Sequence, residues 1–300
     1  MNDLTSIPPD FKAGYVAIIG LPNSGKSTLL NALLNIKLSI ISDKPQTTRR
    51  RIPGILNREN FQAVFLDTPG ILKPKYKLHA RMMEQVHSAL DDADILLFIV
   101  DVTAKHHPVE VDLTAINPKK KPVILLLNKV DLIHKDDLLP LIDLYKDFYL
   151  FEEIIPISAL KQDGVDKVEA AIVQRLPYHP PFYPPDILSD QPERFFVAEI
   201  IREKIFEKFY QEVPYSTEVV VEEFKERPGK KDYIYAIIYV ERNSQKGIII
   251  GKKGEALKKI GEAARKEIEA FLGRPVFLEL RVKVNENWRY DERKLKRLGY

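Results

Sequence analysis

Short apolar runs recur through the first half of the chain, separated by segments with helical spacing. The runs are almost continuously apolar, which is typical of strands buried on both faces of a parallel sheet. The segments between them place apolar residues three and four positions apart. We therefore predict a doubly wound α/β domain with a mostly parallel sheet. The predicted strands cover 15–20, 63–70, 94–102, 122–132 and 152–159, and the predicted helices cover 26–34, 81–90 and 165–174.

The pattern changes after LPYHPPFYPPD (176–186), where five prolines in eleven residues predict a stiff connector. Beyond it, apolar and polar residues alternate strictly over 276–284, and one apolar stripe follows the helical segment 255–272. This predicts a smaller α+β domain with a sheet that packs on one face. The predicted boundaries are 1–180 for the first domain, 181–192 for the proline-rich linker and 193–300 for the second domain. Further predicted elements are a helix over 195–211 and strands over 217–225 and 232–240.

The charge of the chain is distributed unevenly. The net charge is +3, but residues 246–300 alone carry 15 Lys and Arg against 8 Asp and Glu. Such a basic end favours a polyanionic partner, although a solvated basic surface would show the same count. There is no cysteine, and the longest apolar runs are far shorter than the roughly 20 residues that span a bilayer. We expect a cytoplasmic protein.

The segment GLPNSGKS has the spacing of a phosphate-binding loop, G-x-x-x-x-G-K-[ST], and lies between a predicted strand and a predicted helix. Its glycines let backbone N–H groups turn onto phosphate oxygens, Lys26 reaches the β- and γ-phosphates, and the Ser27 hydroxyl ligates magnesium. We therefore predict a site for a nucleoside triphosphate with Mg²⁺. The predicted contacts are Gly20, Leu21, Pro22, Asn23, Ser24, Gly25, Lys26, Ser27 and Thr28.

The segment NKVD (128–131) follows a predicted strand and indicates which base is bound. A carboxylate at Asp131 can accept hydrogen bonds from guanine N1–H and from its exocyclic amine, whereas adenine offers no such donor pair. We therefore expect GTP and GDP as ligands. The segment ISAL (157–160) resembles the last base-contacting loop of GTPases. The predicted contacts on this side are Asn128, Lys129, Asp131, Ser158, Ala159 and Leu160.

Two segments are predicted to respond to the γ-phosphate. The second switch segment, FLDTPG (65–70), ends a strand, where ligands collect in such sheets. Its Asp67 is placed to hold Mg²⁺ through water, and the Gly70 N–H can bond a γ-phosphate only while one is present. The first switch segment, DKPQTTRRR (43–51), offers a magnesium hydroxyl from Thr48, unless it is simply a solvated basic loop. The predicted metal ligands are Ser27, Thr48 and Asp67, with Thr68 and Pro69 as further nucleotide contacts.

Ile71 stands where many GTPases carry the glutamine that orients the attacking water. An isoleucine side chain cannot orient water. We hypothesise that a potassium ion, held by the Asn23 side chain and by switch-segment carbonyls, supplies positive charge instead. The residues predicted to act in hydrolysis are Asn23, Lys26, Thr48 and Gly70.

A second glycine and lysine loop, GKKG (251–254), follows three isoleucines and precedes a helical segment. It has Glu255 where a phosphate-binding loop has Ser or Thr, so it serves a triphosphate with its metal poorly. A G-x-x-G loop can instead hold the backbone of about four single-stranded nucleotides against an apolar groove. We expect isoleucines to wall that groove, with at least one of them in the core. The predicted RNA contacts are Lys246, Ile249, Ile250, Gly251, Lys252, Lys253 and Gly254.

The motifs GLPNSGKS, PQTTR, DTPG, NKVD and ISAL, in this order, resemble the translation-factor-related GTPases. The segment IIIGKKGEALKKIGEAARKEIE resembles a KH domain, an RNA-binding module. Together they resemble the Era family of bacterial ribosome-assembly GTPases over nearly the whole chain. The resemblance implies a monomeric P-loop GTPase domain followed by a KH domain.

The resemblance also implies a function. The chain would hydrolyse GTP as a switch, bind 16S ribosomal RNA near its 3′ end and act in assembly of the 30S ribosomal subunit. Two alternatives stay open, a GTP-dependent partner of an RNA-modifying enzyme and a non-hydrolysing RNA-binding scaffold. The basic amphipathic tail over 287–300 could contact RNA or, peripherally, lipid head groups at the inner face of the cell membrane.

Overall fold

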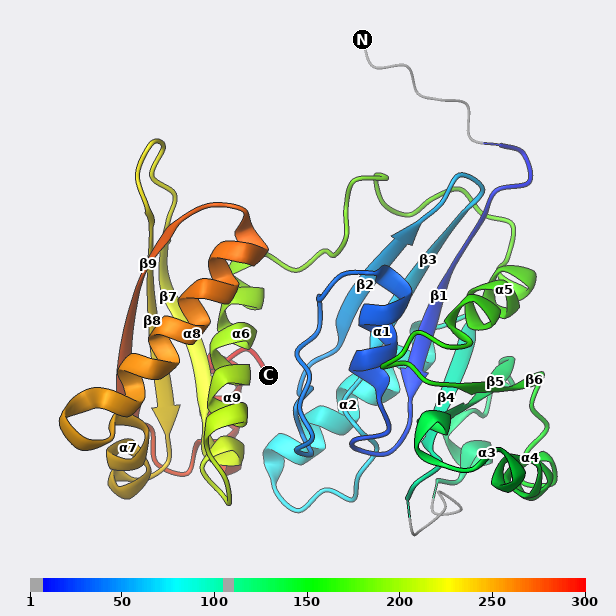
Figure 1. Cartoon of the computed structure of the whole chain (residues 1–300), viewed down its shortest axis with the longest axis horizontal. Helices are drawn as coiled ribbons and strands as arrows, with labels where there is room; N and C mark the ends of the chain where they lie inside the picture. The colour runs from blue at the N-terminus through cyan, green and yellow to red at the C-terminus, as the bar shows by residue number, and fades with distance from the viewer. Residues whose placement is uncertain (1–7, 105–110) are drawn as a thin grey trace. The chain divides into compact units, whose positions relative to one another are not determined.

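Six strands form the sheet of the first unit in the computed structural model, which describes residues 8–104 and 111–300 (Figure 1). The strand order is β2-β3-β1-β4-β5-β6, and only β2 runs antiparallel to its neighbour. This confirms the mostly parallel sheet, while β2 was not predicted. The strands are β1 (Lys12–Ile19), β2 (Ile52–Asn57), β3 (Phe61–Asp67), β4 (Ile95–Asp101), β5 (Val123–Asn128) and β6 (Glu153–Ile157).

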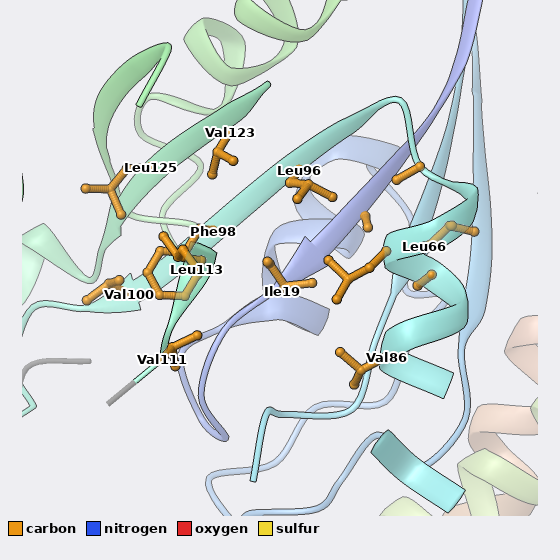
Figure 2. Packing of buried hydrophobic residues seen from close by; sticks show 14 of the residues in the cluster. Ile19, Leu66, Val86, Leu96, Phe98, Val100, Val111, Leu113, Val123 and Leu125 are labelled. Atoms are coloured by element: carbon orange, nitrogen blue, oxygen red, sulfur yellow. The ribbon is translucent and has the colours of Figure 1, made fainter. Parts of the chain in front are cut away.

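Helices cover both faces of this sheet, as the continuous apolar runs predict. On one face, α2 and α4 pack over alternate side chains of β1, β3, β4 and β5. Figure 2 shows part of this layer, with Ile19, Leu66 and Phe98 from three strands and Val86 from α2. On the other face lie α1 and α5 (Figure 1). The helices are α1 (Lys26–Leu34), α2 (Lys77–Asp92), α3 (Leu113–Ile116), α4 (Leu138–Lys146) and α5 (Val165–Arg175), of which α3 and α4 were not predicted.

The proline-rich segment is bound to the first unit through a buried amide. Gln62 on β3 is fully buried, and its Oε1 accepts the backbone N–H groups of Phe182 and Tyr183 at 2.7 and 3.0 Å. Its Nε2 donates to the Tyr183 carbonyl at 2.8 Å, and farther along the segment Leu188 accepts the Ile55 N–H of β2. The described residues divide into two compact units, one made of 8–73, 82–104 and 111–190 and the other of 74–81 and 191–300. Most of the predicted proline-rich linker over 181–192 therefore groups with the first unit.

The second unit is an α+β layer built on a three-stranded sheet of order β7-β8-β9, with β7 antiparallel and β9 parallel to β8. Helices α6 and α8 pack on one face of it, and the core lies between them and the sheet. The three isoleucines before GKKG belong to the short helix α7, so GKKG joins two helices. The elements are α6 (Glu193–Lys208), β7 (Glu218–Lys225), β8 (Asp232–Val240), α7 (Asn243–Ile250), α8 (Glu255–Leu272) and β9 (Val276–Val284).

The C-terminal tail is folded onto the second unit. Trp288 is fully buried, and its Nε1 donates to the Ser216 carbonyl at 2.9 Å. Leu295, on the short helix α9 (Glu292–Arg297), and Leu298 are also buried. The apolar side of the predicted amphipathic tail therefore packs inside the protein, and its charged side faces solvent. Within the described part of the chain, no helix is long and apolar enough to cross a membrane.

Candidate functional site

The predicted nucleotide residues meet at one edge of the six-stranded sheet. Most of them lie at the carboxyl ends of β1, β3, β5 and β6 or on the loops that follow, since parallel strands bring these ends to the same edge. Lys26, Ser27 and Thr28 begin α1, and Thr48 lies between α1 and β2. A cavity of about 510 Å³ opens there. Its lining includes Pro22, Asn23, Gly25, Lys26, Ser27, Thr28, Thr48, Gly70, Asn128, Lys129, Asp131, Ser158 and Leu160. The other predicted contacts are on or next to the same segments, namely Gly20, Leu21, Ser24, Asp67, Thr68, Pro69 and Ala159.

The phosphate-binding loop depends on a glycine and on a buried amide. Gly25 has φ +100°, and a side-chain carbon there would lie 2.1 Å from Nδ2 of Asn128. That nitrogen donates to the Ser24 carbonyl at 2.8 Å, while Oδ1 of Asn128 accepts the Ala159 N–H at 3.0 Å. Asn128 therefore ties the phosphate loop to the ISAL loop, and its own contacts are with protein.

Lys26 is buried at the bottom of the cavity. Its Nζ donates to the carbonyl oxygens of Leu21 at 2.7 Å and Gly20 at 3.3 Å. Burial lowers the pKa of Lys26 to about 8, and the carboxylate of Asp67 only partly opposes this effect. Phosphate oxygens bound beside this ammonium group would raise its pKa and keep it protonated.

Asp67 is a fully buried carboxylate at the end of β3. Its Oδ2 accepts the hydroxyls of Ser27 and Ser39, each at 2.7 Å, and that of Thr48 at 3.5 Å. Its Oδ1 has no hydrogen-bond partner among the described residues. Burial raises the pKa of this carboxyl, and the three hydroxyls oppose the rise. An orphaned anionic oxygen beside two hydroxyls is a donor set that Mg²⁺ prefers, so the residues present fit that ion.

The two switch segments contact the phosphate loop. The Asn23 side chain donates to the Asp43 carbonyl at 2.6 Å. A side-chain carbon on Gly70 would lie 2.6 Å from the Pro22 nitrogen, so only glycine fits there. The Ile71 N–H donates to the Gly20 carbonyl at 3.0 Å, and its side chain packs against the core.

On the base side, the carboxylate of Asp131 lies at the mouth of the cavity, with Lys161 Nζ at 3.5 Å. Hydrogen bonding from Ser158 lowers the pKa of Asp131, and Lys161 adds to this effect. The carboxylate is therefore ionised and ready to accept N–H groups. Leu160 is exposed and flanks the cavity.

Two residues at this edge were not predicted. Asp101 ends β4 and holds Lys129 Nζ at 2.6 Å, which lowers the pKa of Asp101 despite its partial burial. Its position near the carboxyl end of a predicted strand could have indicated a role in the site, because ligands bind at that end of parallel strands. Ser39 is buried beside Asp67, but it stands in an apolar stretch that gives no sign of a polar role.

The GKKG loop of the second unit exposes its lysines and needs its glycines. Gly251 and Gly254 have φ of +73° and +82°, a region that favours glycine. A side-chain carbon on Gly251 would also lie 2.6 Å from the Ala256 side chain, whereas Gly254 faces open space. Lys252 and Lys253 are exposed, so the backbone and two cations face solvent together.

An apolar groove of about 500 Å³ adjoins this loop between α8 and β9. Its floor includes Leu257, Leu278 and Leu280, and its rim carries Lys231, Lys258 and Arg265. Ile249 is fully buried on α7, which confirms that at least one of the isoleucines lies in the core, and Ile250 packs against the same core. Ile248 is exposed, and none of the three is among the residues that line this groove. Lys246 lies on α7, outside the groove lining.

Comparison with known protein families and structures agrees with this division. The family model described as a 50S ribosome-binding GTPase matches residues 15–129, and that of the KH domain matches residues 212–289. GTPase Era of Geotalea uraniireducens is 51% identical over 291 residues, which cover 97% of this chain and 98% of that protein. The chloroplastic GTPase ERA1 of Zea mays is 46% identical over 300 residues, covering 99% of this chain and 72% of that protein.

Solved structures are similar over the same length. The crystal structure of Era in complex with MgGDPNP and nucleotides 1506–1542 of 16S ribosomal RNA matches with a TM-score of 0.93 and 44% identity, covering 97% of this chain and 99% of that chain. An Aquifex aeolicus Era variant bound to GDP and AlF₄⁻ matches with the same TM-score, identity and coverage.

The low pKa of Lys26 predicts a pH-dependent affinity for nucleotide. Phosphate oxygens raise the pKa above its value of about 8 in the empty site, so binding takes up a proton, and affinity falls as pH rises. Between pH 7 and pH 9 the Kd for GDP should increase by about tenfold, with proton uptake seen by calorimetry in buffers of different ionisation enthalpy. A constant Kd without proton uptake would show that Lys26 is fully charged in the empty site.

Proposed function

The chain belongs to the Era family of GTPases, and we propose that it is a GTP-hydrolysing switch that binds 16S ribosomal RNA near its 3′ end during assembly of the 30S subunit. The observation that carries this proposal is the pairing of two different loops in one chain. One loop leads into a buried lysine beside the buried carboxylate of Asp67, and the other presents glycine backbone beside an apolar groove. The first suits a triphosphate with its metal, and the second suits a nucleic-acid strand.

Different residues of this chain would bind the base, the phosphates and the metal ion of GTP. The ionised Asp131 accepts the N1–H and amine of guanine, and Asn128 keeps that loop attached to the phosphate loop. Lys26 exchanges its carbonyl partners for phosphate oxygens. Ser27, Thr48 and Asp67 would hold Mg²⁺, which when bound neutralises charge on the β- and γ-phosphates.

For hydrolysis, Ile71 offers no group to orient water, so charge stabilisation has to come from elsewhere. The Asn23 amide and the Asp43 carbonyl lie within hydrogen-bond distance, and amide and carbonyl oxygens are the ligands that a potassium ion takes. The amide would turn its oxygen toward the ion. We therefore keep the potassium site as part of the proposal.

For RNA, the two positive-φ glycines let a phosphate backbone approach α8 closely, while Lys252 and Lys253 attract it. Bases would then lie in the groove on Leu257, Leu278 and Leu280. Gly261 on α8 leaves room beside Leu280, whose Cδ1 would be 3.5 Å from an added side-chain carbon.

The setting of this activity is part of the proposal. We place it in the cytoplasm, with the protein acting as a monomer on the 30S subunit. The apolar side chains of Trp288, Leu295 and Leu298 are buried, so a peripheral membrane contact of the tail would be mainly electrostatic and sensitive to salt.

The potassium site predicts cation-dependent turnover. GTP hydrolysis should be about tenfold faster or more in KCl than in NaCl at equal ionic strength, because the ion would replace part of the charge that an arginine finger supplies. Asn23→Ala should remove the difference while GDP affinity is kept. Equal rates in both salts, with Asn23→Ala unaffected, would exclude the site. No turnover in either salt, even with RNA present, would favour the scaffold alternative.

The GKKG loop predicts an RNA-binding defect that spares the nucleotide site. Gly254→Asp adds a negative charge and a strained φ of +82°, so affinity for a 16S 3′-end oligonucleotide should fall by about tenfold or more, while GTP hydrolysis without RNA stays unchanged. Fluorescence anisotropy measures the affinity, and crosslinking with sequencing identifies the RNA that each protein binds.

The matched control for this variant is Gly229→Asp. Gly229 has a similar φ of +74°, also faces open space and lies in the same unit, outside the groove lining. Equal losses of RNA affinity in both variants would point to charge or misfolding alone, and would remove the loop from the proposal.

A further inference from the structure

Ser39 is the third hydroxyl on the buried carboxylate of Asp67. It is 1% exposed, and its Oγ donates to Oδ2 at 2.7 Å, as short as the bond from Ser27. It precedes the first switch segment. Neither the phosphate-loop pattern nor the switch motifs include it.

The backbone of Ser39 is fixed on both sides by one amide of α1. Oδ1 of Asn31 accepts the N–H groups of Leu38 and Ser39 at 2.9 and 2.8 Å, and its Nδ2 donates to the Ser39 carbonyl at 2.7 Å. This is the bonding that a neighbouring strand would give, supplied by a single side chain. Ser39 is therefore held in place by the helix that also carries Lys26 and Ser27.

The three hydroxyls differ in what else they must do. Ser27 and Thr48 lie 2.9 Å from each other and line the cavity, so both can turn an oxygen toward a metal. Ser39 is not among the described residues that line the cavity, and among these residues its hydroxyl bonds only to Asp67. Its bond can therefore persist whether or not the metal and the first switch segment are in place, and it leaves Oδ1 as the free oxygen.

We propose that Ser39 is a positioning residue for magnesium. It acts through Asp67, by holding Oδ2 so that Oδ1 faces the metal and its water shell, and Asn31 sets the position of Ser39. Partners of this kind, behind a metal ligand, fix its orientation and influence metal affinity. The inference rests on the proposed function insofar as nucleotide binding needs Mg²⁺.

The test measures retention of nucleotide as a function of Mg²⁺. The dissociation rate of a fluorescent GDP is followed while free Mg²⁺ is varied, for wild type and Ser39→Ala. The Mg²⁺ concentration at half-maximal retention should rise by about tenfold or more in Ser39→Ala, and the rate at saturating Mg²⁺ should match wild type within about twofold. Asn31→Ala should shift the midpoint in the same direction, because it frees the Ser39 backbone but keeps the hydroxyl.

The matched control is Ser216→Ala, which also removes a buried hydroxyl, but one that donates to the Glu212 and Val213 carbonyls in the second unit. Its midpoint should equal that of wild type. An unchanged midpoint in Ser39→Ala overturns the proposal. So does faster release at every Mg²⁺ concentration, which indicates a purely structural role. Wild-type retention that does not depend on Mg²⁺ would instead count against the proposed nucleotide site itself.

Discussion

The site depends on one buried carboxylate. Asp67 is removed from water at the end of β3, and burial alone would favour its neutral form. Three hydroxyls on Oδ2 oppose this, and they come from α1, from the segment that precedes the first switch and from that switch itself. The second oxygen has no partner among the described residues. The carboxylate is therefore placed to bind a cation. It also links α1 to the segment that is expected to sense the γ-phosphate, so the binding of nucleotide, of metal and of the switch segment depends on the same charge.

The two glycine loops meet the same requirement, backbone close to phosphate, in different ways. In the first, a lysine and a hydroxyl follow the glycine at φ +100°. Both line a cavity where burial strengthens the electrostatic interaction with a bound anion. In the second, the lysines come before the last glycine and are exposed, and Glu255 and Ala256 follow Gly254 where Lys26 and Ser27 follow Gly25. A solvent-facing cationic loop beside an apolar groove binds a polymer that runs past it, whereas an enclosed loop binds the end of a phosphate chain. The difference between the two loops follows from the residues that come after the last glycine of each loop and from the burial of the first loop.

Much of this could be predicted, and the failures have physical causes. The parallel strands and α1, α5 and α8 follow from apolar periodicity, and GLPNSGKS, DTPG and NKVD predict residues that the fold brings together at one edge. β2 was missed because its burial comes from pairing with β3 and from the proline-rich segment, not from its own pattern. The three isoleucines favour a strand, but they form a helix because Ile249 packs into the core beside α8. Ser39 is recognisable only from the fold, since its role depends on Asn31 and Asp67, at sequence distances that no local motif covers.

We propose that the bound nucleotide, GTP or GDP, changes the affinity of the second unit for RNA. Coupling of this kind is reciprocal, so GTP must change RNA affinity by the same factor by which RNA changes the preference for GTP over GDP. The direct measurement is a titration of a 16S 3′-end oligonucleotide into the protein loaded with GDP and into the protein loaded with a non-hydrolysable GTP analogue, at one salt and Mg²⁺ concentration. The affinity for RNA should differ by about fivefold or more between the GDP-loaded protein and the protein loaded with the GTP analogue. Identical RNA affinities in the two states would contradict this coupling and would show that the nucleotide site and the RNA site bind independently.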